Sequence, residues 1–166
     1  MNTLDMWVTD HDRSFVRHYL LDFGSTLGST STPERREYSS GFEYYFDYGV
    51  MVKQTATLGL MQPRWFAVQD PNIPEIGFME SRVFDPAAWR PDYPNPAFDE
   101  RTLRDIRWGA RIVSGFTDDH IRAAVAAGQL PDHAAQYLTR VLIERRDKIV
   151  RQWLPQAPPP AERASD

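Results

Sequence analysis

The sequence of 166 residues contains no cysteine, so neither a disulfide nor a thiolate metal site can form. Its four histidines, His11, His18, His120 and His133, lie far apart and show none of the spacings of a zinc site. No apolar stretch approaches the roughly 20 residues that a membrane-spanning helix needs. The opening segment MNTLDMWVTD carries acidic residues and no basic region, so we expect no signal peptide. We therefore expect a soluble protein, cytoplasmic by default, with no membrane span.

The sequence also lacks a segregated block of charge. The 19 basic and 23 acidic residues give a formal net charge of -4, and the two signs are interspersed along the chain. A nucleic-acid-binding surface requires a basic patch, so we expect no nucleic-acid partner. Hydrophobic residues make up 42% of the chain and aromatic residues 13%, which is enough for a packed core. We expect one domain over residues 1–154, followed by a disordered proline-rich tail at 155–166.

Two short segments near the N-terminus, residues 3–8 and 15–22, have the composition of β-strands. The first alternates apolar and polar residues, the second is rich in aromatic and branched residues, and TDHDRS between them is polar. Two such strands across a short polar loop predict a β-hairpin. The second strand ends in Asp22, and a long segment of small residues follows at 24–40. Asp22 is either a metal ligand or an ordinary turn residue at a strand exit.

The remainder of the chain alternates between helical periodicity and proline-rich segments. Residues 61–98 contain most of the prolines together with many aromatic residues, which favours an ordered, packed connection over a solvated linker. Predicted helices cover 41–59, 99–115, 117–128 and 131–154, with Asp99 and Thr117 as N-caps and Gly59, Gly115 and Gly128 as C-terminal stops. The predicted fold class is therefore α+β and mainly helical, with an N-terminal β-hairpin, a proline-rich irregular middle and a C-terminal helical layer.

Two further clusters allow a functional and a structural interpretation. The run ERRDK in the last predicted helix either binds a phosphate group or forms a solvated face of ion pairs, with Glu144 and Lys148 as an i,i+4 pair. The aromatic cluster that includes Tyr45 and Phe46 is either a ligand platform or part of the core. The helical period of 3.6 residues places both side chains inward, which favours the core.

The stretch LLDFGSTLG, residues 20–28, resembles the metal-binding Asp-Phe-Gly segment of the protein-kinase-like superfamily. The order of a hairpin, this triplet, a loop and then helices is similar to the C-lobe of that fold. In the superfamily the aspartate holds the magnesium that bridges the nucleotide phosphates, and a metal-binding asparagine precedes the first hairpin strand. The resemblance therefore implies that Asp22 and Asn2 bind magnesium together with ATP. His18, on the same strand face as Asp22, either orders this carboxylate or is a half-buried strand residue.

The whole chain apart from its tail is also similar to a group of uncharacterised bacterial proteins. The shared stretches are NTLDMWV, VRHYLLDFGSTLGS, WRPDYPNPAFDERTLRDIRWGARIV and LIERRDKIV. This resemblance implies a longer parent protein, in which a kinase-like D-x-K-x-x-N loop ends at Asn2. The chain would then be a C-lobe fragment of a Mg/ATP-dependent phosphotransferase, inactive without its N-terminal lobe.

The chain departs from the kinase pattern in two respects. The interval from Asn2 to Asp22 is longer than the compact hairpin of typical protein kinases, and no Ala-Pro-Glu follows the loop. A second function therefore stays open, a non-catalytic helical domain that binds a protein partner. In that case Asp22 is only a strand exit, and the chain is not an enzyme.

Overall fold

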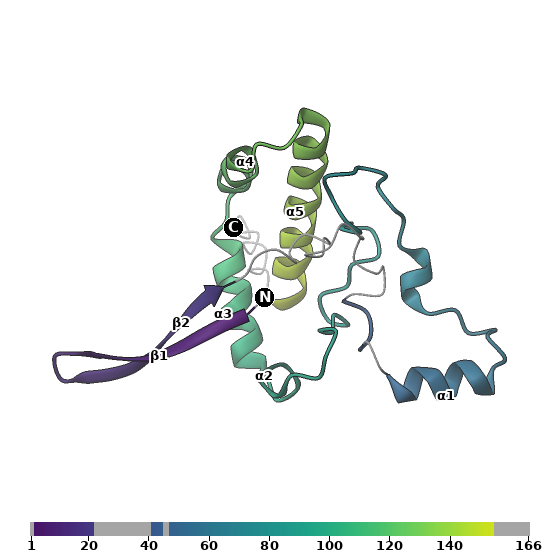
Figure 1. Ribbon diagram of the computed structural model, residues 1–166, viewed down its shortest axis with the longest axis horizontal. Coiled ribbons are helices and arrows are strands. Elements are labelled where there is room, and N and C mark those ends of the chain that lie inside the picture. Colours follow the sequence, from purple (N-terminus) through teal and green to yellow (C-terminus); the bar gives the residue numbers. More distant parts are fainter. Residues whose placement is uncertain (1, 22–40, 45–46, 155–166) are drawn as a thin grey trace, which may run out of the picture.

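The computed structural model describes residues 2–21, 41–44 and 47–154, with the backbone alone for 2–5, 18–21 and Ala97 (Figure 1). The predicted α+β class is confirmed. A two-stranded hairpin opens the chain, an irregular middle follows, and helices make up the C-terminal part. The predicted tail and the segment after Asp22 lie outside the described residues.

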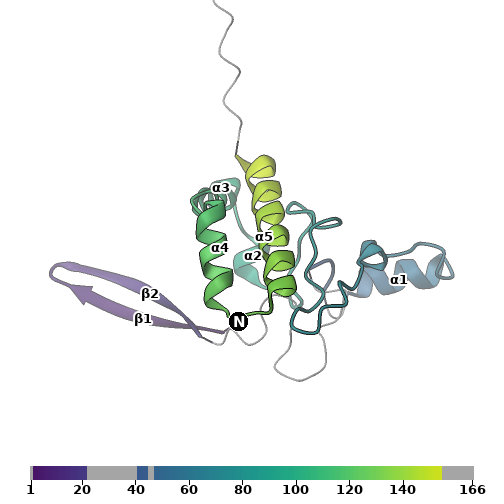
Figure 2. The ribbon, with the colours of Figure 1, turned by 90° about the horizontal axis from the view of Figure 1, so that it is seen from above.

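The hairpin consists of β1, Asn2–Asp10, and β2, Arg13–Leu21, which pair antiparallel along their whole length. A two-residue turn joins them, with His11 in the left-handed region at φ 51°. Both strands are longer than the sequence predicts. Within the described residues no helix packs against either strand, and Figures 1 and 2 both show the hairpin projecting from the helices. The Trp7 side chain is accordingly 76% exposed.

Helix α1, Tyr48–Ala56, begins later than the predicted segment 41–59. Asp47 provides its N-cap, because the Oδ1 atom accepts a hydrogen bond from the Val50 amide at 3.1 Å. The helix ends before Gly59, which takes a left-handed φ of 78° as expected of a stop residue. No residue of α1 is buried, and the predicted inward residues Tyr45 and Phe46 lie outside the described part of the chain.

Three longer helices form the C-terminal layer. They are α3, Leu103–Ser114, α4, Asp118–Ala127, and α5, Asp132–Trp153, and both α3 and α4 pack on α5 (Figure 2). The cap of α4 is as predicted, since the Thr117 hydroxyl accepts from the His120 amide at 3.2 Å. The buried hydrophobic residues of this layer are Ala110, Ile121, Val125, Ala134, Leu138 and Val141, and Ile76 of the irregular middle packs with them.

The predicted N-cap of α3 is wrong. Asp99 is the last residue of a four-residue helix α2, Pro96–Asp99, and its carboxylate accepts a hydrogen bond from the Tyr44 hydroxyl at 2.8 Å. Thr102 caps α3 instead. Its hydroxyl accepts from the Asp105 amide at 3.3 Å, and the Asp105 carboxylate accepts from the Thr102 amide at 2.9 Å. This reciprocal capping box satisfies two backbone donors at once, those of Thr102 and Asp105.

The proline-rich middle contains one short 3-10 helix, η1, Arg64–Ala67, and is otherwise irregular. It is packed, as the sequence predicts, and the structure shows that α5 provides part of the packing. The Lys148 ammonium donates to the carbonyls of Ser81, Arg82 and Phe84 at 2.6, 3.0 and 3.1 Å. Because an irregular segment has few backbone hydrogen bonds of its own, these contacts fix its path over the helix.

Candidate functional site

The predicted metal ligands belong to the open end of the hairpin, where both strands meet the rest of the chain. The register pairs Asn2 with Leu21, so the chain leaves β2 directly beside the first residue of β1. Facing Cα atoms of an antiparallel pair lie about 4.5–5.5 Å apart. Asp22, one residue beyond Leu21, is therefore a sequence neighbour of the residue that faces Asn2.

The described residues do not reach the predicted ligands themselves. Asp22 and the side chain of Asn2 lie outside them, as does the imidazole of His18, whose Cα pairs with that of Asp5. Among the residues that are described, no group of three histidines or carboxylates could hold a metal ion. The magnesium site at Asp22 and Asn2 stays a prediction, with the hairpin register as its structural context.

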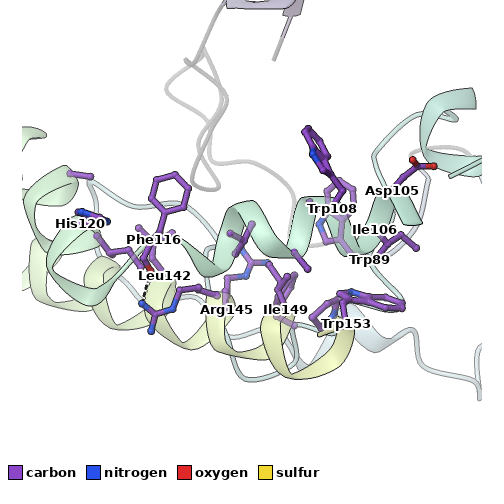
Figure 3. A pocket seen from close by; sticks show the side chains of 18 of the residues that line it. Trp89, Asp105, Ile106, Trp108, Phe116, His120, Leu142, Arg145, Ile149 and Trp153 are labelled. Carbon is purple, nitrogen blue, oxygen red and sulfur yellow. Dashed lines mark hydrogen bonds between the residues drawn. The ribbon is translucent and has the colours of Figure 1, made fainter. Parts of the chain in front are cut away.

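A second candidate site, which sequence reasoning missed, is an open apolar groove of about 920 Å³ in the helical layer (Figure 3). Its walls come from α2, α3, α4, α5 and the irregular segment before α2. Large apolar side chains dominate the lining, among them Phe84, Trp89, Phe98, Ile106, Trp108, Phe116, Leu142, Ile149 and Trp153. Trp108 is 63% exposed and Phe116 is 53% exposed, so two aromatic rings of the lining face solvent.

The geometry of α3 explains why the groove stays open. Ile106, Ala110 and Val113 share the helix face that packs toward α5, as their three- and four-residue spacing predicts. Gly109 borders this face next to Val113, whereas Trp108 lies on the opposite side of the same helix. A Cβ atom added at Gly109 would meet nothing within 4 Å, so this lining position leaves unfilled space.

A buried arginine lies on the α5 side of the groove. The Arg145 guanidinium stacks over the Phe84 ring at 4.0 Å, and burial lowers its pKa from the ordinary arginine value. Its Nε atom is buried and has no hydrogen-bond partner among the described residues. The aromatic contact compensates part of the cost of burying this charge.

The other charges of the ERRDK run are held by the protein itself. Arg146 pairs with Asp147 and Asp118, each at 2.7 Å, and hydrogen bonds to Asp147 and Asp118 raise its pKa. Lys148 bonds the three carbonyls of the irregular segment, and Glu144 accepts from the Ser81 hydroxyl and pairs with Arg140. The run therefore forms ion pairs as expected, but the predicted Glu144–Lys148 pair is wrong, and four of the five side chains are half-buried by tertiary contacts.

Three arginines of α3 differ from Arg140, Arg145 and Arg146 of α5, which all have partners. Arg104, Arg107 and Arg111 are exposed, and none of them forms an ion pair or hydrogen bond with another described residue. Arg104 and Arg111 lie four and three residues from Trp108, so all three side chains are neighbours on the helix surface. The spacing is visible in the segment RTLRDIRWGAR, and we name Arg104, Arg107 and Arg111 the α3 arginine stripe.

Comparisons with protein-family models, curated proteins and solved structures gave no match. The similarity to the kinase C-lobe and the similarity to uncharacterised bacterial proteins therefore both stay predictions. Within the described residues, none of the helices has the length and apolar character that crossing a membrane requires.

Proposed function

We propose that this chain is the C-lobe part of a kinase-like phosphotransferase that uses ATP as phosphoryl donor and magnesium as cofactor. The observation that supports the proposal is the hairpin register, which pairs Asn2 with Leu21, the residue that precedes Asp22 in the sequence. A carboxylate and an amide oxygen are hard ligands of the kind that magnesium prefers. Two ligands from the protein fit an ion that keeps several waters and takes further oxygens from phosphates.

The proposed chemistry is in-line phosphoryl transfer, in which the protein acts mainly by positioning and by neutralising charge. Bound magnesium supplies positive charge next to the phosphates. Asp22, the residue after β2, and Asn2, the first residue of β1, would hold the ion through their side-chain oxygens. The general base and the lysine that grips the phosphates come from residues outside this chain, so the chain by itself is inactive.

Calorimetric titration of ATP with magnesium tests the proposal, with the longest natural form of the protein that contains this chain. We expect coupled binding of the two, and we expect Asp22→Asn to abolish it while the circular dichroism spectrum stays unchanged. Asp12→Asn is the matched control, because Asp12 is an exposed carboxylate in the turn at the opposite end of the hairpin. If Asp22→Asn binds as tightly as the unaltered protein, Asp22 is a turn residue and the proposal is wrong.

A second candidate function is a helical domain that binds a protein partner without catalysis. The open apolar groove favours it, because isolated soluble proteins seldom expose a contiguous patch of large apolar side chains without a binding role. The two functions involve different parts of the molecule. Magnesium and ATP concern the open end of the hairpin, whereas the groove lies between helices on which the hairpin does not pack.

A further inference from the structure

We infer that the apolar groove binds a small apolar carboxylate, such as a fatty acid, whose carboxylate pairs with the Arg145 guanidinium. A small molecule would then occupy the groove in place of the protein partner of the second candidate function. The magnesium site at the hairpin is a separate matter, because the hairpin does not pack on the helices that form the groove.

The lining of the groove carries more positive than negative charge. It contains three arginines, Arg101, Arg145 and Arg146, and one carboxylate, Asp105. Arg146 is neutralised by ion pairs with two aspartates that are not part of the lining. The Asp105 carboxylate accepts hydrogen bonds in the capping box at the start of α3. Within the described residues neither Arg101 nor Arg145 forms an ion pair, so the lining attracts an anion.

The Arg145 guanidinium has no strong acceptor within the described part of the chain. Its Nη1 atom donates to the Met79 Sδ atom at 2.7 Å, which is a weak acceptor, and its Nε atom has no partner there. The carboxylate oxygens of Glu80, which is nearby, accept from the Val83 amide at 3.2 Å. Burial lowers the pKa of Arg145, because it removes water from the charged form. A charge in this setting is costly unless an anion compensates it.

Arg101 differs from Arg145 in this respect. Its guanidinium donates to the Phe98 carbonyl and lies over the Phe98 ring at 5.0 Å. The lining therefore offers one poorly compensated guanidinium, that of Arg145. One guanidinium matches one carboxylate, which it binds in bidentate geometry, whereas a phosphate carries up to two charges.

The position of Arg145 and the size of the groove define the rest of the ligand. Arg145 is half-buried and lines the groove between Leu142 and Ile149 of α5 (Figure 3). The groove volume of about 920 Å³ lies within the range of roughly 300–1,000 Å³ that is typical of small-molecule sites. Such sites combine an apolar lining with a few polar groups that fix the orientation of the ligand. The large apolar side chains therefore fit an apolar body, and Arg145 fits its carboxylate.

Isothermal titration calorimetry with three matched ligands tests the inference. Decanoate, decanol and decylamine share one apolar chain and differ only in the head group. We expect saturable binding of decanoate, with one site per chain. Decanol lacks the charge and should bind at least about tenfold more weakly, and decylamine more weakly still, because Arg145 repels its ammonium group.

A variant of Arg145 separates a ligand-binding role from a structural one. Arg145→Met removes the charge and keeps an apolar side chain, and it should weaken decanoate binding by at least about thirtyfold. The melting temperature of the ligand-free variant should equal or exceed that of the unaltered protein, because the variant no longer buries a poorly compensated charge. The matched control is Arg107→Gln, which removes an exposed arginine of α3 outside the lining and should leave decanoate binding unchanged.

A second variant tests the place of the apolar chain independently. Gly109 belongs to the lining, and a Cβ atom added there would meet nothing within 4 Å. Gly109→Leu should therefore fold, fill part of the groove and weaken decanoate binding by at least about tenfold. Thermal unfolding checks that the variant is folded.

Five results would overturn the inference. Absence of saturable decanoate binding would exclude the ligand class, and equal affinity for the three ligands would indicate an apolar surface of the kind that a protein partner covers. Unchanged decanoate affinity in folded Arg145→Met or Gly109→Leu would place the ligand elsewhere. A lower melting temperature of Arg145→Met would assign Arg145 a structural role. A dimer in sedimentation velocity that Gly109→Leu dissociates would assign the groove to a second copy of the chain. None of these results affects binding of magnesium and ATP, which tests the hairpin site separately.

Discussion

The hairpin and the helical layer differ in how far their apolar side chains are buried. In the helical layer Leu138 is 2% exposed and belongs to a cluster that joins α4, α5 and the segment around Ile76. In the hairpin Trp7 is 76% exposed, and no helix of the described residues covers either strand. The helical layer therefore has its own hydrophobic core, whereas the hairpin relies on its ladder of backbone hydrogen bonds.

Because of this difference in burial, we expect the helical layer to be more stable than the hairpin. A two-stranded hairpin is marginal in water unless a third strand or a helix packs on it. Pairs of residues that face each other across the two strands, such as Trp7 and Val16, contribute at most about 1 kcal/mol each to stability. We therefore expect the helical layer to account for the cooperative unfolding of the chain and the hairpin to open locally.

The largest expected effect contrasts a core residue with an exposed one. Leu138→Ala should lower the free energy of unfolding by about 2–5 kcal/mol, because it removes buried methyl groups and leaves a cavity. Trp7→Ala removes a larger side chain, yet it should change the same quantity by less than about 0.5 kcal/mol. Urea denaturation monitored by circular dichroism measures both. A loss above about 2 kcal/mol for Trp7→Ala would mean that the hairpin is packed and would break the comparison.

A second variant tests how the helical layer holds the irregular segment. Lys148→Met keeps most of the side-chain volume but removes the donor to the carbonyls of Ser81, Arg82 and Phe84. Hydrogen bonds from a charged group contribute roughly 1.5–3 kcal/mol, so we expect a destabilisation of about 2 kcal/mol in the same urea experiment. Arg151→Met, an exposed cation one turn further along α5, is the control. Equal stability of the two variants would show that the carbonyl contacts contribute nothing.

A third variant concerns the start of α3. Thr102→Ala removes the capping hydroxyl and should cost about 1 kcal/mol, whereas Asp99→Ala should cost less, because Asp99 caps no helix of the helical layer. Urea midpoints of the two variants decide the question. A larger destabilisation by Asp99→Ala than by Thr102→Ala would mean that Asp99 is the N-cap of α3, as the sequence pattern predicts.

The smallest expected effect is a loss of stability at the start of α3 at low pH. Hydrogen bonds from the Thr102 side chain and amide hold the pKa of Asp105 below its ordinary value. A carboxyl with a depressed folded pKa stabilises the folded state above its unfolded pKa, and this contribution is lost as pH falls through the folded pKa. An NMR titration of the Asp105 carboxyl should therefore give a pKa below about 3.9, and Thr102→Ala should raise it. A pKa that Thr102→Ala leaves unchanged would contradict the capping box as its cause.

The sequence predicts elements whose signals are local. The strands of the hairpin, the caps at Thr117 and Gly128 and the long last helix all follow from periodicity and from residues within one turn. The capping box at Thr102 was also readable, as a threonine followed three residues later by an acid. Asp99 competed with it because aspartate is an equally common N-cap.

The parts that sequence reasoning missed depend on residues distant in the chain. The Lys148 ammonium donates a hydrogen bond to the carbonyl of Ser81, which lies 67 residues away in the sequence, so an i,i+4 pattern could not reveal this partner. The groove depends in the same way on how α3, α4 and α5 pack, which no single helix encodes. The magnesium site stays a prediction that rests on a three-residue motif, its hairpin context, Asn2 and the loop that follows, and its aspartate lies outside the described residues. The hairpin register supplies a context for that site but not its geometry.

Amide hydrogen exchange on the unmodified chain tests the central claim most directly, that the helical layer is the stable unit and the hairpin an accessory to it. We predict that the amides of α5 around Leu138 exchange only through global unfolding, while those of β1 and β2 exchange orders of magnitude faster through local opening. The same protection factor in both regions would contradict this account. It would mean that the hairpin unfolds together with the helices and that a contact outside the described residues joins them.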